Sequence, residues 1–393
     1  MSRNGRRHVA SRRRRAGAPT IPYFPWRRIE SPYPPLDILE PAQIEAIHDA
    51  SMEILEEMGI QVLSPRALEV LARGGVEVDR GTGVVRFDRG LIAELVAKAP
   101  EQVSVTPRNP ARRLTIGGRH INFSLVSGPP NVHDCERGRR SGNYRDYCDL
   151  VRLMHSLEII HCLGNQPVAP IDLPAPSRHL DCYLADVIYT DRAYNCTAIG
   201  AERVLDGIDI AAIARGVTRA DLIASPAVMT NINVNSPRLL DNAMCEGLMA
   251  MAEWGQPVVV TPFTLMGAMT PITLAAALAQ QNAEALAGIA LAQLVRPGTP
   301  VVYGAFTSNV DMRTGAPAFG TPENAKATVV AGQLARRYGL PYRASNANAS
   351  NVADAQAVYE SQMSLWSAIL GHANIIFHGA GWLEGGLCAS FEK

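Results

Sequence analysis

The stretch that decides the fold runs from Pro257 to Gly304 and reads PVVVTPFTLMGAMTPITLAAALAQQNAEALAGIALAQLVRPGTPVVYG. Its two β-branched runs, Val258–Val260 and Val301–Tyr303, flank a long segment of Ala, Leu and Gln at 273–294. This order predicts one β-α-β unit. The loop at 261–271 leaves the carboxyl end of the first strand, and in parallel α/β folds that end usually carries the chemistry.

The same pattern repeats along most of the chain. The predicted strands are 121–126, 158–163, 194–199, 226–231, 257–261, 300–304, 341–345 and 374–378. The predicted helices are 143–156, 177–190, 201–215, 238–254, 273–295, 321–338 and 353–371. Eight strands with helices between them indicate a (β/α)8 TIM barrel over residues 120–393. The chain reaches Lys393 where an eighth helix would begin, so either the strand count is one too high or that helix is missing or truncated.

Two further regions precede the predicted barrel. Residues 36–119 predict a small α+β cap, in which a helix begins at Pro41 and ends at Gly59 and a hairpin turns at 80–83. Residues 1–35 are rich in Arg and Pro and predict a disordered basic and Pro-rich arm. Alternatively, the arm packs on a neighbouring subunit of a homo-oligomer, through Tyr23, Phe24 and Trp26.

The composition excludes several classes of protein. The formal net charge of zero hides nine Arg within residues 1–28, which leave 28 basic against 37 acidic residues in the remainder. An acidic body of this kind predicts no nucleic-acid groove. Seven irregularly spaced Cys without a C-x-x-C motif predict free thiols in the cytoplasm. The longest apolar helix carries polar residues at 280–284, so we expect no membrane span.

Amides, hydroxyls and aromatic rings follow the predicted strands and are expected to line one mouth. The candidates at these strand ends are Asn231, Asn233, Phe263, Phe306, Ser308, Asn346, Asn348, His378, Trp382 and Glu384. Singly, each Asn is as well explained as a turn residue, and each aromatic ring as core packing. Their recurrence at several strand ends favours a binding site.

Barrel chemistries can be compared with this lining. A Schiff-base enzyme needs a lysine on a strand, but the only lysines are Lys98, Lys326 and Lys393. His378 and Glu384 alone make a poor metal site, so we expect no metal. A phosphate site in the Gly-rich segment 379–386 remains possible. A nearly neutral aromatic mouth suits a quaternary ammonium held by cation–π attraction, and many amides suit the carboxamide rim of a corrin ring.

The opening stretch resembles the trimethylamine methyltransferase family, in particular its non-pyrrolysine branch, which includes glycine betaine:corrinoid methyltransferases. Matching stretches are LEPAQIEAIHDASMEILEEMGI at 39–60, FGTPENAKATVVAGQLARRYGLPYR at 319–343 and GWLEGGLCASFEK at 381–393. The resemblance covers roughly residue 36 to the end. Family members continue past the last of these stretches, so the chain resembles a member without the C-terminal segment.

The resemblance implies a TIM barrel that transfers a methyl group from a small methylated amine to Co(I) of a separate corrinoid protein. In the trimethylamine branch, pyrrolysine is thought to bind and orient the amine. This sequence has only standard residues, which favours a substrate with a permanent positive charge, such as glycine betaine. The corrinoid cofactor is then carried by the partner, and we expect none on this chain.

Strand-end position then suggests roles within such a site. Phe263, Phe306 and Trp382 are the candidates for an aromatic cage, and Glu384 is the candidate counter-ion. A betaine carboxylate would pair with either of two basic side chains, Arg343 or His378. These roles are inferred from position alone.

Two other functions remain open. The first is a non-catalytic or remnant member of the family that binds a ligand or a corrinoid protein. The second is a barrel lyase that holds a phosphorylated substrate at residues 379–386.

Overall fold

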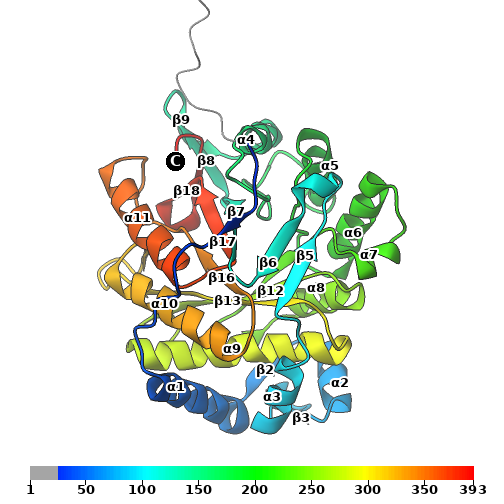
Figure 1. The fold of residues 1–393 in the computed structure, drawn as a ribbon, viewed down its shortest axis with the longest axis vertical. Coiled ribbons are helices and arrows are strands. Elements are labelled where there is room, and N and C mark those ends of the chain that lie inside the picture. The colour runs from blue at the N-terminus through cyan, green and yellow to red at the C-terminus, as the bar shows by residue number, and fades with distance from the viewer. Residues whose placement is uncertain (1–24) are drawn as a thin grey trace, which may run out of the picture.

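The computed structural model describes residues 25–393, which form a mixed α/β fold (Figure 1). Six parallel strands pair in the order β10, β12, β13, β16, β17, β7. Their bounds are β7 (His120–Leu125), β10 (Thr230–Val234), β12 (Val258–Met266), β13 (Val301–Gly304), β16 (Tyr342–Ser345) and β17 (Ile375–Ala380). The predicted β-α-β unit is confirmed, with β12 and β13 paired in parallel from Val258–Val301 onward.

Helices alternate with these strands, largely as the sequence predicts. Their bounds are α4 (Tyr144–Ser156), α5 (Arg178–Tyr189), α6 (Ala201–Arg215), α8 (Asn242–Glu253), α9 (Leu274–Val295), α10 (Pro322–Arg337) and α11 (Ala355–Leu370), with a short α7 (Asp221–Ala224) after α6. The caps follow from the sequence. The side chain of Thr321 accepts a hydrogen bond from the Asn324 amide at the start of α10, and Asp354 accepts one from Ala357 at the start of α11.

The predicted strands 158–163 and 194–199 were wrong as full strands. Only single-residue parallel bridges form there, between Ser124 and Cys162, Cys162 and Ala193, and Asn195 and Met229. At 158–163 a turn takes up the first residues, because the Ile160 amide donates to the Leu157 carbonyl at 3.0 Å. Only the residues around Cys162 are left to pair with their neighbours.

The N-terminal cap packs along α9. It contains α1 (Pro41–Glu53), a π-helical turn η1 (Ile54–Met58), α2 (Pro65–Arg73) and α3 (Arg89–Val96), which lie beside α9 in Figure 1. The predicted hairpin is confirmed as β3 (Glu77–Asp79) and β4 (Val84–Arg86). Their sheet also contains β2 (Ile60–Val62) and β11 (Leu239–Leu240), which comes from the loop after β10. Cap and body therefore share one sheet.

A second hairpin fills the space beneath the parallel strands. It consists of β5 (Gln102–Val105) and β6 (Leu114–Gly117), with the turn η2 (Pro110–Arg112) between them. Val105 and Ile116 belong to one buried cluster with Val259, Val302 and Ile375 of the parallel strands. The hairpin thus closes the end of the strand layer opposite the strands' carboxyl ends.

Shorter strands surround the carboxyl ends. β14 (Phe306–Val310) extends the edge of β12 and pairs with β15 (Pro317–Ala318). After β17, the chain forms β18 (Trp382–Leu383), the turn η3 (Glu384–Gly386) and β19 (Cys388–Ser390). β19 joins a small sheet with β8 (Asn131–Asp134) and β9 (Gly138–Ser141). The segment after β17 therefore builds part of the rim.

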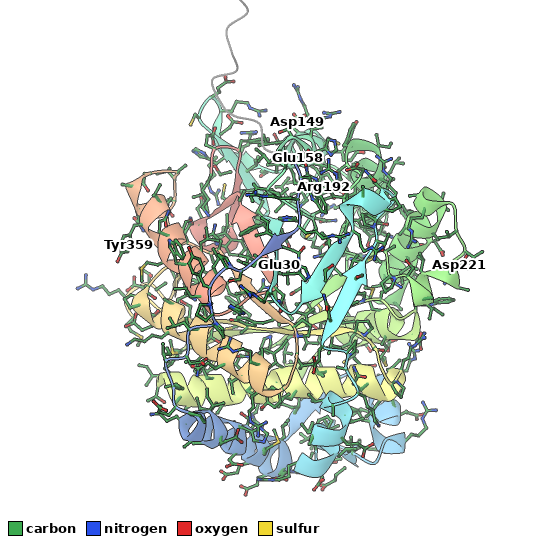
Figure 2. The ribbon with its side chains drawn as sticks, in the orientation of Figure 1. Glu30, Asp149, Glu158, Arg192, Asp221 and Tyr359 are labelled. Carbon is green, nitrogen blue, oxygen red and sulfur yellow. The ribbon has the colours of Figure 1, made fainter. Side chains whose placement is uncertain are left out.

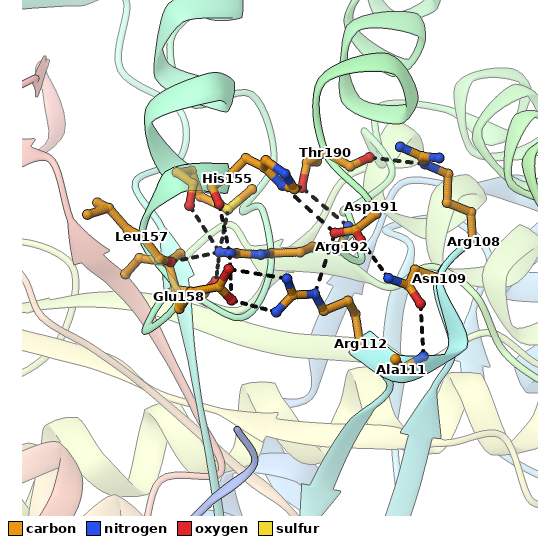
Figure 3. Close-up of polar contacts among 12 residues, drawn as sticks. Arg108, Asn109, Ala111, Arg112, His155, Leu157, Glu158, Thr190, Asp191 and Arg192 are labelled. Carbon is orange, nitrogen blue, oxygen red and sulfur yellow. Dashed lines mark hydrogen bonds and ion pairs between the residues drawn. The ribbon is translucent and has the colours of Figure 1, made fainter. Parts of the chain in front are cut away.

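A partly buried ion-pair network, with Arg192 fully buried at its centre, fastens the hairpin to the body (Figure 3). The Arg192 guanidinium lies 3.3 Å from the Glu158 carboxylate, and Figure 2 places these two residues together. Arg112 of η2 donates to the same carboxylate at 2.5 Å and lies 3.7 Å from Asp191. Asn109 donates to Asp191 at 2.6 Å. The network joins the hairpin turn to the bridged segment at 193–195.

The predicted basic tail, with Tyr23 and Phe24, lies outside the described residues. Trp26 lies against its own chain, because the guanidinium carbon of Arg112 is 5.5 Å from its ring centroid. The arm continues as β1 (Ile29–Glu30), which pairs antiparallel with β7. Over residues 25–393, no helix is both long and apolar enough to cross a bilayer.

Candidate active site

A cavity of about 400 Å³ opens at the carboxyl ends of the parallel strands. Seven of the predicted site residues line it. They are Asn231, Asn233, Phe263, Phe306, Arg343, His378 and Trp382. These residues come from five different strands or their loops. Side chains that are far apart in sequence therefore lie in one place, as their positions at the strand ends predicted.

Aromatic rings form one wall of the cavity. The ring centroid of Phe306 is 5.2 Å from that of Phe263 and 5.9 Å from that of Trp382. Phe319 stacks on Phe306 at 4.9 Å. The Trp382 indole donates a hydrogen bond to the Asn348 carbonyl at 3.1 Å, which fixes the ring. This wall can hold a trimethylammonium group by cation–π attraction.

A hydrogen-bonded chain of hydroxyl and amide groups forms another part of the lining. The Thr261 hydroxyl donates to the Asn231 side-chain oxygen at 2.8 Å, and the Asn231 amide donates to Asn233 at 2.8 Å. This arrangement follows from the period of two along β10, which places both Asn on one face. Asn165, which follows the bridged segment at 162, lines the same cavity.

Arg343 is the one lining residue with a full charge, within residues 25–393. It is 2% exposed, and burial lowers the pKa of its guanidinium to about 9. His378 lies 4.0 Å from Trp382 between ring centroids and has a left-handed backbone, with φ of 61°. Burial first, and then the charge of Arg343, lower the pKa of His378 well below its usual value. The imidazole is therefore neutral at physiological pH.

Four predicted site residues are not among those that line the cavity. Ser308 donates to the Ala318 carbonyl at 2.8 Å, so its hydroxyl turns toward β15. Asn346 donates to Gly379 at 3.4 Å, and Asn348 donates to Ser361 at 3.4 Å. Glu384 accepts from Arg139 of β9, with both carboxylate oxygens 2.9 Å from Nε. Direct contact of these four with a ligand stays a prediction.

Sequence reasoning missed other lining residues. The lining also contains Phe377 and Met244, and Phe319 supports it from behind. Gly385 and Gly386, from the Gly-rich segment 379–386 that the sequence did single out, line the same cavity. Phe319 begins the stretch FGTPENAKATV at the start of α10, so its position before a capped helix was the available signal. Nothing in the sequence indicated that Phe377 faces the cavity while its neighbour Ile376 does not.

The residue types that ligate metals are not clustered in the described part of the chain. Within residues 25–393, no three His, Cys, Asp or Glu side chains are grouped so that they could hold a metal ion. The cavity offers instead an aromatic wall, several amides and one guanidinium. Groups of these kinds are able to bind and orient a small charged ligand.

The fold is shared with solved amine methyltransferases. The monomethylamine methyltransferase MtmB of Methanosarcina barkeri matches with a TM-score of 0.54 at 9% identity, over 88% of this chain and 80% of that one. At this identity the likeness concerns the fold alone.

Sequence comparison identifies the family. The model for trimethylamine methyltransferase (MTTB) matches residues 3–393, and the chain belongs to this family. It is 37% identical to a glycine betaine methyltransferase of Desulfitobacterium hafniense over 362 residues, which are 92% of this chain and 75% of that protein. It is 28% identical to a proline betaine:corrinoid methyltransferase of Eubacterium limosum, over 79% of this chain and 65% of that protein. The chain thus spans 65% to 75% of the length of these two relatives.

Proposed function

We propose that this chain transfers a methyl group from a quaternary or tertiary methylated amine, of the glycine betaine type, to Co(I) of a corrinoid on a separate protein. The observation that carries the proposal is the aromatic wall of Phe263, Phe306 and Trp382 in a cavity without acidic lining residues, in residues 25–393 of a member of this family.

The proposed scaffold is a (β/α)8 barrel. The parallel pairings run from β10 through β12, β13, β16 and β17 to β7, and single bridges lead on through Cys162, Ala193 and Asn195 to Met229 beside β10. A ring of eight parallel segments accounts for these pairings. The cavity then occupies the mouth where barrel enzymes bind their substrates.

The proposed reaction requires positioning of the substrate more than acid–base catalysis by the protein. Co(I) supplies an electron pair to the methyl carbon as the carbon–nitrogen bond breaks, and the electrons of that bond remain on nitrogen. From a quaternary amine the leaving tertiary amine is neutral, so the step needs no proton donor, whereas a tertiary amine must already carry a proton on nitrogen to leave as a neutral amine. A neutral His378 fits this requirement. The contribution of the chain is to hold the ammonium group in line with its acceptor.

Each side chain has a proposed role. Phe263, Phe306 and Trp382 hold the ammonium group, while Asn231 and Asn233 face the mouth, where amides suit the carboxamide rim of a corrin. Glu384 is paired with Arg139, so we propose that it holds the adjoining Gly385–Gly386 turn and does not serve as the counter-ion.

The cellular setting is also a proposal. All seven cysteines lie within the described residues and are unpaired, which supports a reducing compartment such as the cytoplasm. A homo-oligomer stays a prediction.

The test is a methyl-transfer assay with cob(I)alamin as the acceptor. The protein is mixed under anaerobic conditions with reduced cobalamin and, in turn, glycine betaine, proline betaine, carnitine and trimethylamine. We expect the absorption of Co(I) to give way to that of methyl-Co(III) with at least one of these amines. Absence of transfer from every amine, also when corrinoid proteins of related systems serve as acceptors, would overturn the proposal.

A further inference from the structure

One guanidinium in the cavity wall has no counter-ion. Arg343 of β16 is 2% exposed, and its single hydrogen bond within residues 25–393 runs from Nη1 to the Ala305 carbonyl at 3.3 Å. Among the same residues, its buried Nε has no partner. Over residues 25–393, no acidic side chain forms an ion pair with it.

The surroundings of this charge are apolar. The guanidinium carbon lies 5.2 Å from the ring centroid of Phe306 and 4.6 Å from that of Phe377. Both rings line the cavity with it, so the charge is at the wall of a binding site and not in a closed core. Neutral His378 does not compensate it.

A buried charge is costly unless it is paired, and the cavity is the place from which a pair can come. A ligand carboxylate would supply the missing negative charge. Its two oxygens would accept hydrogen bonds from the guanidinium N–H groups that have no protein acceptor, in a bidentate pair. A ligand with only a positive charge would instead add a like charge close to Arg343. The net charge of the ligand therefore decides whether it fits.

We propose that Arg343 is the carboxylate receptor of this site, and that it selects zwitterionic betaines against methylated amines that carry no carboxylate. The inference rests on the proposed function for the identity of the ammonium end. Of the two carboxylate partners anticipated from the sequence, Arg343 and His378, the structure assigns the role to Arg343. The ammonium group then lies against the wall of Phe263, Phe306 and Trp382.

The test is calorimetric binding of matched ligands. Glycine betaine carries both charges, choline only the positive one, and 3,3-dimethylbutanoate only the negative one, because a tert-butyl group replaces the ammonium group. For the unmodified protein we expect glycine betaine to bind roughly 10- to 100-fold more tightly than choline. Equal or tighter binding of choline would overturn the inference without any need for a variant.

Two variants test whether Arg343 causes this preference for glycine betaine over choline. Arg343→Met should lose the preference for glycine betaine and bind choline at least as well as the unmodified protein, which also shows that its cavity is intact. Arg343→Lys keeps the charge and should retain part of the preference. Undiminished affinity of Arg343→Met for glycine betaine would contradict the role of Arg343.

The outcomes separate this inference from the proposed function. Methyl transfer from choline or trimethylamine but not from betaines would support the function and overturn the role of Arg343. Binding of betaines through Arg343 without methyl transfer to any corrinoid would support the role and overturn the function. Absence of binding by all three ligands would overturn the role of Arg343.

Discussion

Two arginines of this protein are equally buried but differ in their surroundings. Arg192 is 3% exposed and Arg343 is 2% exposed. Arg192 pairs with Glu158 and donates to the carbonyls of four residues around the end of α4 (Figure 3). Arg343 donates to one carbonyl, at 3.3 Å.

The difference separates a structural charge from a binding charge. Where a guanidinium holds the fold together, as Arg192 does between the hairpin and the body, the chain itself supplies its partners. A buried polar group that the chain leaves unpaired calls for another explanation, and a ligand is one such explanation when the group faces a cavity. Both arginines have a buried Nε without a partner among residues 25–393, and both line a cavity. They differ in their counter-ion, because Arg192 has the Glu158 carboxylate and Arg343 has no acidic partner among these residues.

The largest expected effect is on the structural arginine. In Glu158→Gln, Arg192 and Arg112 lose the carboxylate that they share, and breaking a buried pair typically costs about 3–5 kcal/mol. We expect the free energy of unfolding, measured in urea, to fall by that amount. A matched control is Glu77→Gln, which removes an exposed pair with Arg86 and should change it by less than about 1 kcal/mol. Equal stability of the two variants would contradict the structural role of the Arg192–Glu158 pair.

The second prediction concerns Arg343→Met. Removing an unpaired buried charge should leave the free protein as stable as before, or more stable by about 0.5–2 kcal/mol, because stability and binding are in conflict at such sites. Urea unfolding without ligand measures the change. Arg192→Met is the matched control and should be clearly destabilised. Similar losses in both variants would mean that Arg343 is also structural.

The third prediction is a pH dependence of binding. Burial lowers the pKa of Arg343 to about 9, so the free site is charged below that pH and loses its charge above it. The carboxylate of glycine betaine stays ionised throughout, and its affinity should therefore be flat from about pH 7 to 8 and fall toward about tenfold per pH unit above pH 9. Calorimetric titration over this range measures it. Affinity that is constant to pH 10 would contradict a free site with this pKa.

The smallest predicted effect concerns the aromatic wall. Phe306→Leu keeps an apolar surface but removes a ring face, and it should weaken binding of glycine betaine by about 0.5–2 kcal/mol. The tert-butyl isostere 3,3-dimethylbutanoate has no cationic end, so the substitution should weaken its binding by less. Equal losses for the two ligands would show that Phe306 acts by shape and not by its interaction with the ammonium group.

The sequence predicted most of the parallel strands and helices because their signals are local. The β-branched runs and caps such as Thr321 and Asp354 lie within a few residues of the elements that they define. The strands at 158–163 and 194–199 were overestimated, and in the first of them a turn from Leu157 to Ile160 takes up the opening residues. Apolar content alone does not reveal such a turn.

The candidate site was predictable in location but less so in detail. The strand-end rule found Phe263, Phe306 and Arg343, which line one cavity. It did not find the pairing of Glu384 with Arg139, because side-chain direction beyond a strand depends on the turns that follow. Here the left-handed backbone of Glu384, with φ of 53°, is one such turn. The Arg192–Glu158 pair was missed for a related reason, since its residues belong to different β-α units.

A crystal structure of the protein with glycine betaine tests the central claim most directly. The account predicts one molecule in the cavity at the strand ends, with its carboxylate paired to the Arg343 guanidinium and its ammonium group against Phe306 and Trp382, methyl groups toward the mouth. A betaine bound elsewhere, or bound here with its carboxylate away from Arg343, would contradict the account.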